Sequence, residues 1–130
     1  MVKPELEELL VPDAAGWRDW LLEHHDASPG VWLVRHKKGG SVTELTYAQA
    51  VEEAVCFGWI DGQARRRDEG STTIRMTPRG PRSHWSVSNV ERVERLDAEG
   101  RMHPAGRAAV DVAKANGRWA AAVAERDARG

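Results

Sequence analysis

Residues 72–89 read TTIRMTPRGPRSHWSVSN, and this stretch joins a strand, a loop and the start of a helix. The side chains from Thr72 to Thr77 alternate with the period of two that is typical of a strand. The prolines and the glycine between positions 78 and 81 end that strand and stiffen the loop that follows. Serines at positions 83, 86 and 88 each offer a helix N-cap, and Ser88 with Glu91 matches a capping box. The chain therefore changes here from strand to helix.

Two further strands are predicted upstream of this stretch. Residues 60–67 run toward 71–77 through Asp-Glu-Gly at 68–70, which has the composition of a three-residue hairpin loop with glycine at a positive φ. Residues 31–36, VWLVRH, are β-branched and aromatic and form the third predicted strand.

Helix signals occupy the rest of the chain. Asp13 is in the position of an N-cap for a first helix, and the sequence TYAQ from Thr46 is a capping box for a second. Gly58 follows the second helix as a C′ residue. A third helix follows the loop, a fourth begins at Pro104, and an alanine-rich segment forms the last. We therefore expect an α+β fold in one domain over residues 1–130, with a small antiparallel sheet of about three strands packed with five or so helices.

Length and composition limit the class of protein. The chain has 130 residues, enough for one compact domain, and its 41 % hydrophobic and 30 % charged residues are typical of a soluble globular protein. No apolar run is long enough to cross a membrane, and the acidic N-terminus lacks the features of a signal peptide, so a cytoplasmic location is expected. The single cysteine, Cys56, excludes an internal disulfide and is expected to be a small buried hydrophobe.

The net charge of −1 hides a local basic patch. Residues 65–82 hold six arginines against two acids, and pairing of the hairpin strands predicts that Arg65, Arg67 and Arg75 share one polar face. Such a patch attracts an anion, but it is too small to predict binding of nucleic acid. Solvated arginines on a hairpin surface are the alternative interpretation.

Six tryptophans stand beside one phenylalanine and one tyrosine. A small core can use such bulky side chains, and we expect most of Trp17, Trp20, Trp32 and Trp119 to lie in it. The other two tryptophans, at positions 59 and 85, stand beside polar groups, which leaves either burial or a ligand contact open.

The loop between the strand at residues 71–77 and the following helix contains arginines and an aromatic residue next to a helix N-terminus. This combination suits an anionic or planar polar ligand. We predict a binding module for a small anionic or sugar-like ligand. Its predicted site consists of Trp59, Asp61, Arg75, Arg79, Arg82, His84, Trp85 and Asn89. Within it we expect Arg75 to have a structural role and Arg79 or Arg82 to be open to the ligand.

Two other functions remain open. No catalytic residue is assigned, but Asp61 and His84 are candidates for the acid and base of an enzyme, although Asp61 could equally bond its own turn or pair with an arginine. A tryptophan-rich surface could instead meet a protein partner. No His/Cys cluster has metal spacing, and no nucleotide-binding or hydrolase motif occurs, so we expect no metal and no cofactor.

Ordered motifs over nearly the whole chain resemble a known family. They are CFGWIDG at residues 56–62, Arg75-x-Thr77-Pro78-Arg79, Ser83-x-Trp85-Ser86-x-x-Asn89, Gly100-Arg101-Met102-x-Pro104-x-Gly106 and Gly117-Arg118-Trp119. In this set and order they resemble the YdeI/OmpD-associated family, also called bacteriocin-protection proteins. The resemblance implies a single YdeI-like domain, a bacterial cytoplasmic protein of α+β build, and no established biochemical activity. Longer members continue into a helical C-terminal region rich in Lys, Arg and Glu, whereas this sequence ends at Gly130.

Overall fold

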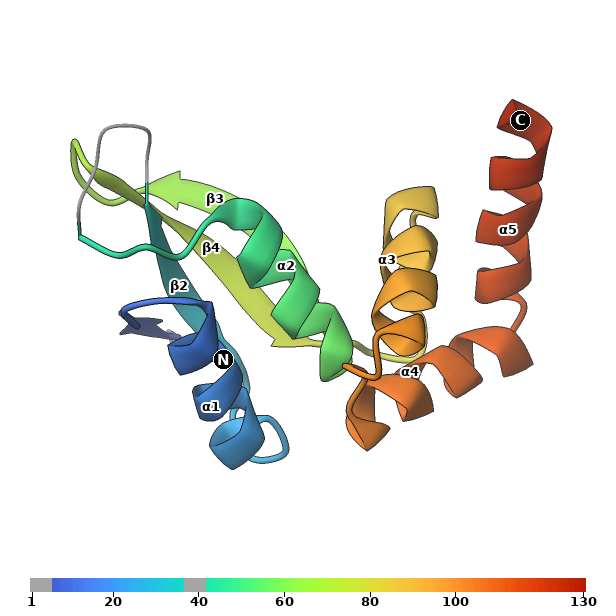
Figure 1. Cartoon of the computed structure of the whole chain (residues 1–130), viewed down its shortest axis with the longest axis horizontal. Coiled ribbons are helices and arrows are strands. Elements are labelled where there is room, and N and C mark those ends of the chain that lie inside the picture. The colour runs from blue at the N-terminus through green and yellow to red at the C-terminus, as the bar shows by residue number, and fades with distance from the viewer. Residues whose placement is uncertain (1–5, 37–41) are drawn as a thin grey trace, which may run out of the picture. The chain divides into compact units, whose positions relative to one another are not determined.

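The computed structural model describes residues 6–36 and 42–130 and has an α+β fold with five helices and a four-stranded mixed sheet (Figure 1). The chain divides into two compact units. The first unit runs to Ala54 and resumes from Ile60 to Pro78, and the second contains Val55–Trp59 and Arg79–Gly130. That residues 1–130 form a single domain stays a prediction.

Three of the four strands are those that the sequence predicts. They are β2 (Val31–His36), β3 (Trp59–Arg66) and β4 (Ser71–Pro78). The fourth, β1 (Glu7–Leu9), is absent from the prediction because it is short and carries two glutamates instead of an apolar alternation. It pairs in parallel with β2, whereas β2 and β4 are antiparallel, so the sheet β1-β2-β4-β3 is mixed and not wholly antiparallel. The parallel pair is possible because α1 (Ala14–His24) lies in the crossover between its strands.

Strand pairing sorts the side chains of the sheet onto two faces. Opposite residues of neighbouring strands share a face, so Trp32 lies beside Arg75 on one face, while Leu33 and Arg35 point to the other. Arg35 contacts the ring of Tyr47, the first residue of α2 (Tyr47–Cys56). Helix α2 therefore covers the face of Leu33, which is fully buried.

The opposite face carries the three arginines that the hairpin pattern predicts. The guanidinium of Arg65 lies 4.0 Å from the ring centroid of Trp32, which is opposite Arg75 in the β2–β4 pair. Arg67 forms an ion pair of 3.1 Å with Glu8, the residue opposite Trp32 in β1. The predicted clustering of arginines on one face of the hairpin is therefore confirmed.

Helices α1 and α2 begin at their predicted caps. The carboxylate of Asp13 accepts a hydrogen bond from the N–H of Gly16 at 2.9 Å. At α2, Thr46 and Gln49 bond each other's backbone N–H groups at 3.1 and 3.2 Å, which completes the capping box. The indole N–H of Trp17 then joins the two helices by donating to the carbonyl oxygen of Ala50 at 3.0 Å.

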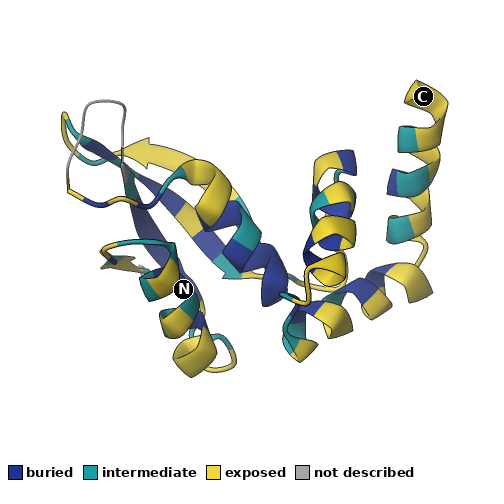
Figure 2. Ribbon diagram, in the orientation of Figure 1, coloured by how far each residue is buried: buried dark blue, intermediate teal, exposed yellow. Residues whose placement is uncertain are grey.

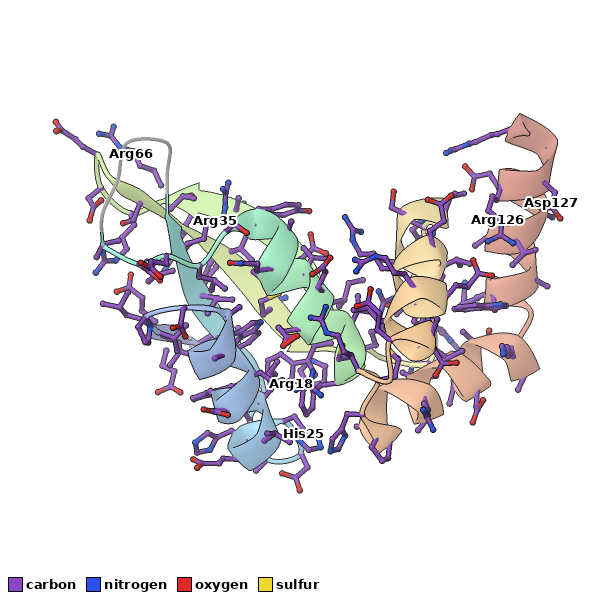
Figure 3. All side chains as sticks on the ribbon, in the orientation of Figure 1. Arg18, His25, Arg35, Arg66, Arg126 and Asp127 are labelled. Atoms are coloured by element: carbon purple, nitrogen blue, oxygen red, sulfur yellow. The ribbon has the colours of Figure 1, made fainter. Side chains whose placement is uncertain are left out.

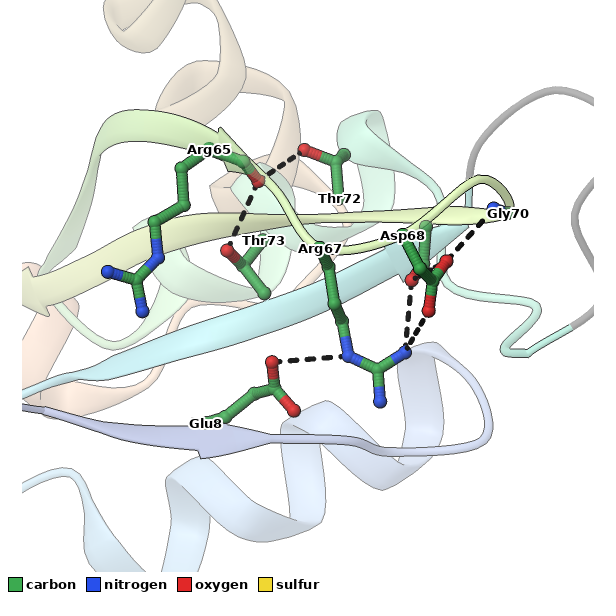
Figure 4. Close-up of polar contacts among 8 residues, drawn as sticks. Glu8, Arg65, Arg67, Asp68, Gly70, Thr72 and Thr73 are labelled. Carbon is green, nitrogen blue, oxygen red and sulfur yellow. Dashed lines mark hydrogen bonds and ion pairs between the residues drawn. The ribbon is translucent and has the colours of Figure 1, made fainter.

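The tip of the β3–β4 hairpin differs from the prediction (Figure 4). The loop has four residues, 67–70, and Gly70 does not adopt a positive φ. Instead, the carboxylate of Asp68 accepts from the N–H of Gly70 at 2.9 Å and from the hydroxyl of Ser71 at 2.8 Å. An aspartate that bonds the backbone two residues ahead closes a turn without left-handed backbone. Arg67 adds an ion pair of 2.9 Å to the same carboxylate.

This network makes the ionisation of Asp68 a probe of the hairpin. Its pKa is lowered from the ordinary value of 3.8, chiefly by the hydroxyl of Ser71, then by the N–H of Gly70 and by the charge of Arg67. Because the folded-state pKa is depressed, the contribution to stability is present above about pH 3.8 and is lost as the pH falls through the folded-state value. We expect NMR titration to place this pKa below 3.8, and Ser71→Ala to raise it. Ser88→Ala, at an exposed serine, is the control, and an Asp68 that titrates at its ordinary value would contradict the network.

The second unit is mainly helical. Its helices are α3 (Val87–Ala98), α4 (Pro104–Ala115) and α5 (Arg118–Arg129). Of the three candidate serines, Ser86 caps α3 by accepting from the N–H of Asn89 at 3.1 Å, so the capping box predicted from Ser88 does not start the helix. Pro104 occupies the first turn of α4, and Gly58 has a φ of 76°, both as predicted.

Burial corrects part of the tryptophan prediction. Buried residues run along β2, β4 and α2, whereas α5 is mostly exposed (Figure 2). Trp17 and Trp32 are buried, but Trp20 and Trp119 are half-buried. Trp59 and Trp85, which the sequence left open, are only 1 % and 5 % exposed and so serve packing.

Cys56 is buried as predicted. Within residues 6–36 and 42–130, no helix is long and apolar enough to span a membrane.

Candidate functional site

The predicted loop is organised by Arg79. Its guanidinium lies 3.8 Å from the ring centroid of Trp85, and its Nη1 donates to the hydroxyl of Ser83 at 3.1 Å and to the carbonyl oxygen of His84 at 2.9 Å. These contacts all stay within residues 79–85, so the arginine holds the loop on itself. Of the two arginines expected to be open to a ligand, Arg79 is thus engaged in the scaffold.

Replacing Arg79 by Ala is expected to lower the free energy of unfolding by about 1–3 kcal/mol, since Ser83 and His84 lose a charged donor and Trp85 loses its stacked cation. Arg82→Ala, in the same loop, is the matched control and should change it by less than about 0.5 kcal/mol, because this exposed side chain makes no hydrogen bond or ion pair within the described residues. Urea denaturation followed by circular dichroism measures both. Equal effects of the two changes would show that Arg79 has no scaffold role.

The other loop residues do not share one cavity. A space of about 160 Å³ lies between Arg79, Pro81 and Trp85 and the α4 residues Ala109, Val112 and Ala113. A second space, of about 120 Å³, is lined by His84 and Trp85 together with Arg118 and Glu125 of α5. Trp85 lines both spaces, and its ring packs edge-on against Trp119. Both are too small for an ordinary ligand pocket.

Asn89 and Trp59 are parts of the packed structure of the second unit. Asn89 is buried, its N–H is capped by Ser86, and its side-chain oxygen accepts from Arg92 at 2.9 Å. Trp59 is buried at the start of β3. Neither residue lines a cavity with the loop arginines among the cavities described here.

Asp61 and Arg75 belong to the first unit. Asp61 lies within β3, not in a turn, and accepts from the hydroxyl of Tyr47 at 3.0 Å. This bond matches neither alternative that the sequence left open, a bond to its own turn or a pair with an arginine. Arg75 was expected to be structural, yet it is exposed and forms no hydrogen bond or ion pair by its side chain in the described part of the chain. The structural role thus falls to Arg79 and not to Arg75.

A pocket that the sequence did not predict lies at the hairpin end of the sheet. We call it the arginine pocket. It has a volume of about 250 Å³ and is lined by Arg35, Ala64, Arg65, Arg66, Ser71 and Thr72. Arg35 comes from β2 and faces Thr72 in β4, whereas Arg66 ends β3; both are labelled in Figure 3. The one signal in the sequence is that Arg35 follows directly on the apolar run of its strand, residues 31–34.

The described residues that line the arginine pocket include no carboxylate, and its side-chain cations are Arg35 and Arg66, because the guanidinium of Arg65 lies over Trp32 on the other face. The Nε of Arg35 is buried and has no hydrogen-bond partner within residues 6–36 and 42–130, although its guanidinium lies 5.5 Å from the ring centroid of Tyr47. Arg66 is exposed and makes no ion pair in the same part of the chain. The hydroxyl of Thr72 already donates to the carbonyl oxygen of Arg65 at 2.8 Å. The guanidinium groups of Arg35 and Arg66 are therefore the side-chain donors that a ligand in the pocket would meet.

The largest described cavity belongs to the second unit, with a volume of about 480 Å³. It is lined by Val93, Glu94, Asp97, Met102, Arg107, Val110, Asp111, Lys114 and Trp119. Its charges have both signs and are largely compensated: Arg107 pairs with Asp97 at 3.3 Å, Arg126 pairs with Glu94, and Lys114 lies 5.4 Å from the ring centroid of Trp119. This cavity therefore favours no single ligand charge.

The fold and the pocket together define the chain as an α+β protein with a cationic pocket beside a β-hairpin. It belongs to the family described as Domain of unknown function (DUF8412), whose model matches residues 9–109. No curated protein and no solved structure matches the chain.

Proposed function

We propose that this protein binds a small anionic ligand through an oxyanion group, a phosphate or a carboxylate, in the arginine pocket. The observation that carries the proposal is that Arg35 and Arg66 line one pocket, that neither makes an ion pair within the described residues, and that no carboxylate stands among the described residues that line the pocket.

The physical argument rests on two neighbouring cations, Arg35 and Arg66, that have no carboxylate beside them among the described lining residues. Arg35 is half-buried, and a partly desolvated cation gains from an anionic partner. Guanidinium groups bind carboxylate and phosphate in a planar, two-bond geometry that adds both strength and orientation. The pocket of about 250 Å³ lies just below the usual range of ligand sites, so it suits a small oxyanion or the charged end of a larger molecule.

The loop site predicted from the sequence remains a second proposed location for the same class of ligand. Arg82 and His84 are exposed there, and neither side chain has a polar partner in the described residues. An enzyme that uses Asp61 and His84, and a protein-interaction module, remain alternative proposals. Membership in the YdeI/OmpD-associated family and a bacterial cytoplasmic location are also proposals, supported by the sequence motifs alone.

Thermal unfolding with phosphate, sulfate and chloride at equal ionic strength tests the proposal. A ligand that binds only the folded state stabilises it by about 2.7 kcal/mol at one hundred times its Kd, so phosphate or sulfate should raise Tm above the chloride value. Arg66→Ala should remove most of the difference in Tm between phosphate or sulfate and chloride. Arg35→Lys should do the same, because lysine keeps the charge but loses the planar pair of donors.

Arg118→Ala removes an exposed arginine of the second unit and serves as the matched control. It should keep the full response to phosphate. A wild-type Tm that does not distinguish phosphate or sulfate from chloride would refute the proposal for these two anions, and a panel of small carboxylates extends the test to the rest of the ligand class. A response that persists in Arg66→Ala and Arg35→Lys but disappears in Arg82→Ala would move the site to the loop.

A further inference from the structure

In the part of the chain that the structure describes, the outer edge of β3 is the longer of the two edges of the sheet. In the order β1-β2-β4-β3, this eight-residue strand pairs with β4 on one side and with no other strand of the described residues. Its residues from Gly62 to Arg66 are all exposed, whereas most of the neighbouring β4 is buried or half-buried. Such an edge presents a row of backbone N–H and C=O groups that can pair with an added strand.

Arginines flank this edge on both faces of the sheet. Successive residues of a strand point to opposite faces. Arg65 lies over Trp32 on one face, and Arg66 lines the arginine pocket with Arg35 on the other. The exposed segment itself, residues 62–66, carries no acid. A strand added beside β3 would therefore meet a guanidinium on either face.

We propose that the edge of β3 binds an extended acidic segment of a partner protein, which adds to the sheet as a fifth strand and places a carboxylate in the arginine pocket. The proposal rests on the proposed function, because it names the source of the oxyanion. Hydrogen bonds between the backbones of the added strand and β3 would supply affinity. The carboxylates of the added strand would make the binding specific for acidic segments. A second copy of this chain fits less well, since pairing of two β3 strands sets their arginines against each other and like charges on paired strands are destabilising.

The probe is a blocked, fluorescein-labelled peptide of nine residues in which pairs of glutamates alternate with single valines. Fluorescence anisotropy with the full chain, at a fixed salt concentration, measures its Kd. We expect binding, a loss of about tenfold or more when the central five backbone nitrogens of the peptide are methylated, and no binding when its glutamates are replaced by lysines. Arg66→Glu should abolish binding, and Arg118→Ala should leave the Kd unchanged.

The outcomes separate the two proposals. If phosphate raises Tm but the methylated peptide binds as well as the unmodified one, the pocket binds carboxylates and strand addition is refuted. If phosphate raises Tm and no peptide binds, the oxyanion proposal stands and this one fails. If a short DNA duplex binds more tightly than the acidic peptide, or if the chain forms dimers that Arg66→Glu does not disrupt, the partner is of another class and the proposal is overturned.

Discussion

Gly106→Ala is expected to lower the free energy of unfolding by about 3 kcal/mol or more, because the added methyl group has no room beside the backbone of Cys56. A Cβ at this position would overlap the carbonyl oxygen of Cys56 and would lie 2.7 Å from its carbonyl carbon. That carbonyl cannot move aside freely, because it also accepts a hydrogen bond of 3.0 Å from the N–H of His103. The backbone of α4 must therefore shift, and the capped start of the helix shifts with it.

Gly80→Ala is the matched control for this prediction. It makes the same change in the same unit, but no atom lies within 4 Å of the added Cβ and the backbone does not have a positive φ. Its effect should be within about 1 kcal/mol and could be stabilising, since alanine restricts the unfolded chain more than glycine does. Urea denaturation of both variants measures the difference. Similar stability of the two variants would contradict the close approach of α4 to Cys56.

Trp17→Ala should cost about 3–5 kcal/mol, the range for removing a large buried aromatic side chain. Trp17 is fully buried, stacks on Trp20 with 5.6 Å between ring centroids, and donates its indole N–H to the carbonyl oxygen of Ala50. Its removal leaves a cavity between α1 and α2 and also withdraws the donor from a buried carbonyl. The first unit, which contains Trp17, should therefore lose more stability than the second unit.

Leu22→Ala, in the same helix, is the control for Trp17. Leu22 is 49 % exposed, so its truncation should change the free energy of unfolding by less than about 0.5 kcal/mol. Hydrogen exchange resolves the two units, because amides of α1, α2 and β2 report the first unit and amides of α3 and α4 report the second. Uniform loss of protection in both units of Trp17→Ala would show that they unfold as one.

Local signals in the sequence predicted most of the elements. Asp13 and Thr46 cap their helices as expected, because a cap depends on hydrogen bonds to residues two or three positions ahead. Pro104 at the start of α4 is also explained locally, because the first turn of a helix tolerates a residue without a backbone N–H. At the hairpin tip, two local solutions competed, and the carboxylate of Asp68 closed the turn in place of a glycine with positive φ.

The candidate site was predicted less well than the elements. The sequence correctly placed Arg65, Arg67 and Arg75 on one face, since that needs only the hairpin and a period of two. It could not assign a role to each arginine. Arg79 is held by its own loop, whereas Arg35 lines a pocket with Arg66, a residue 31 positions further along the chain.

The sequence by itself determined the α+β class, three of the four strands, the caps of α1 and α2 and the basic character of the hairpin, because each depends on side chains a few residues apart. Only the tertiary structure decided that β1 pairs with β2, that Trp59 and Trp85 are buried, and that a guanidinium of β2 shares a cationic pocket with β3. Those features depend on strand order and packing between distant segments. The groups that surround a guanidinium after folding determine whether its charge is stabilised. The role of each arginine is therefore a property of the fold and cannot be read from its neighbours in the sequence.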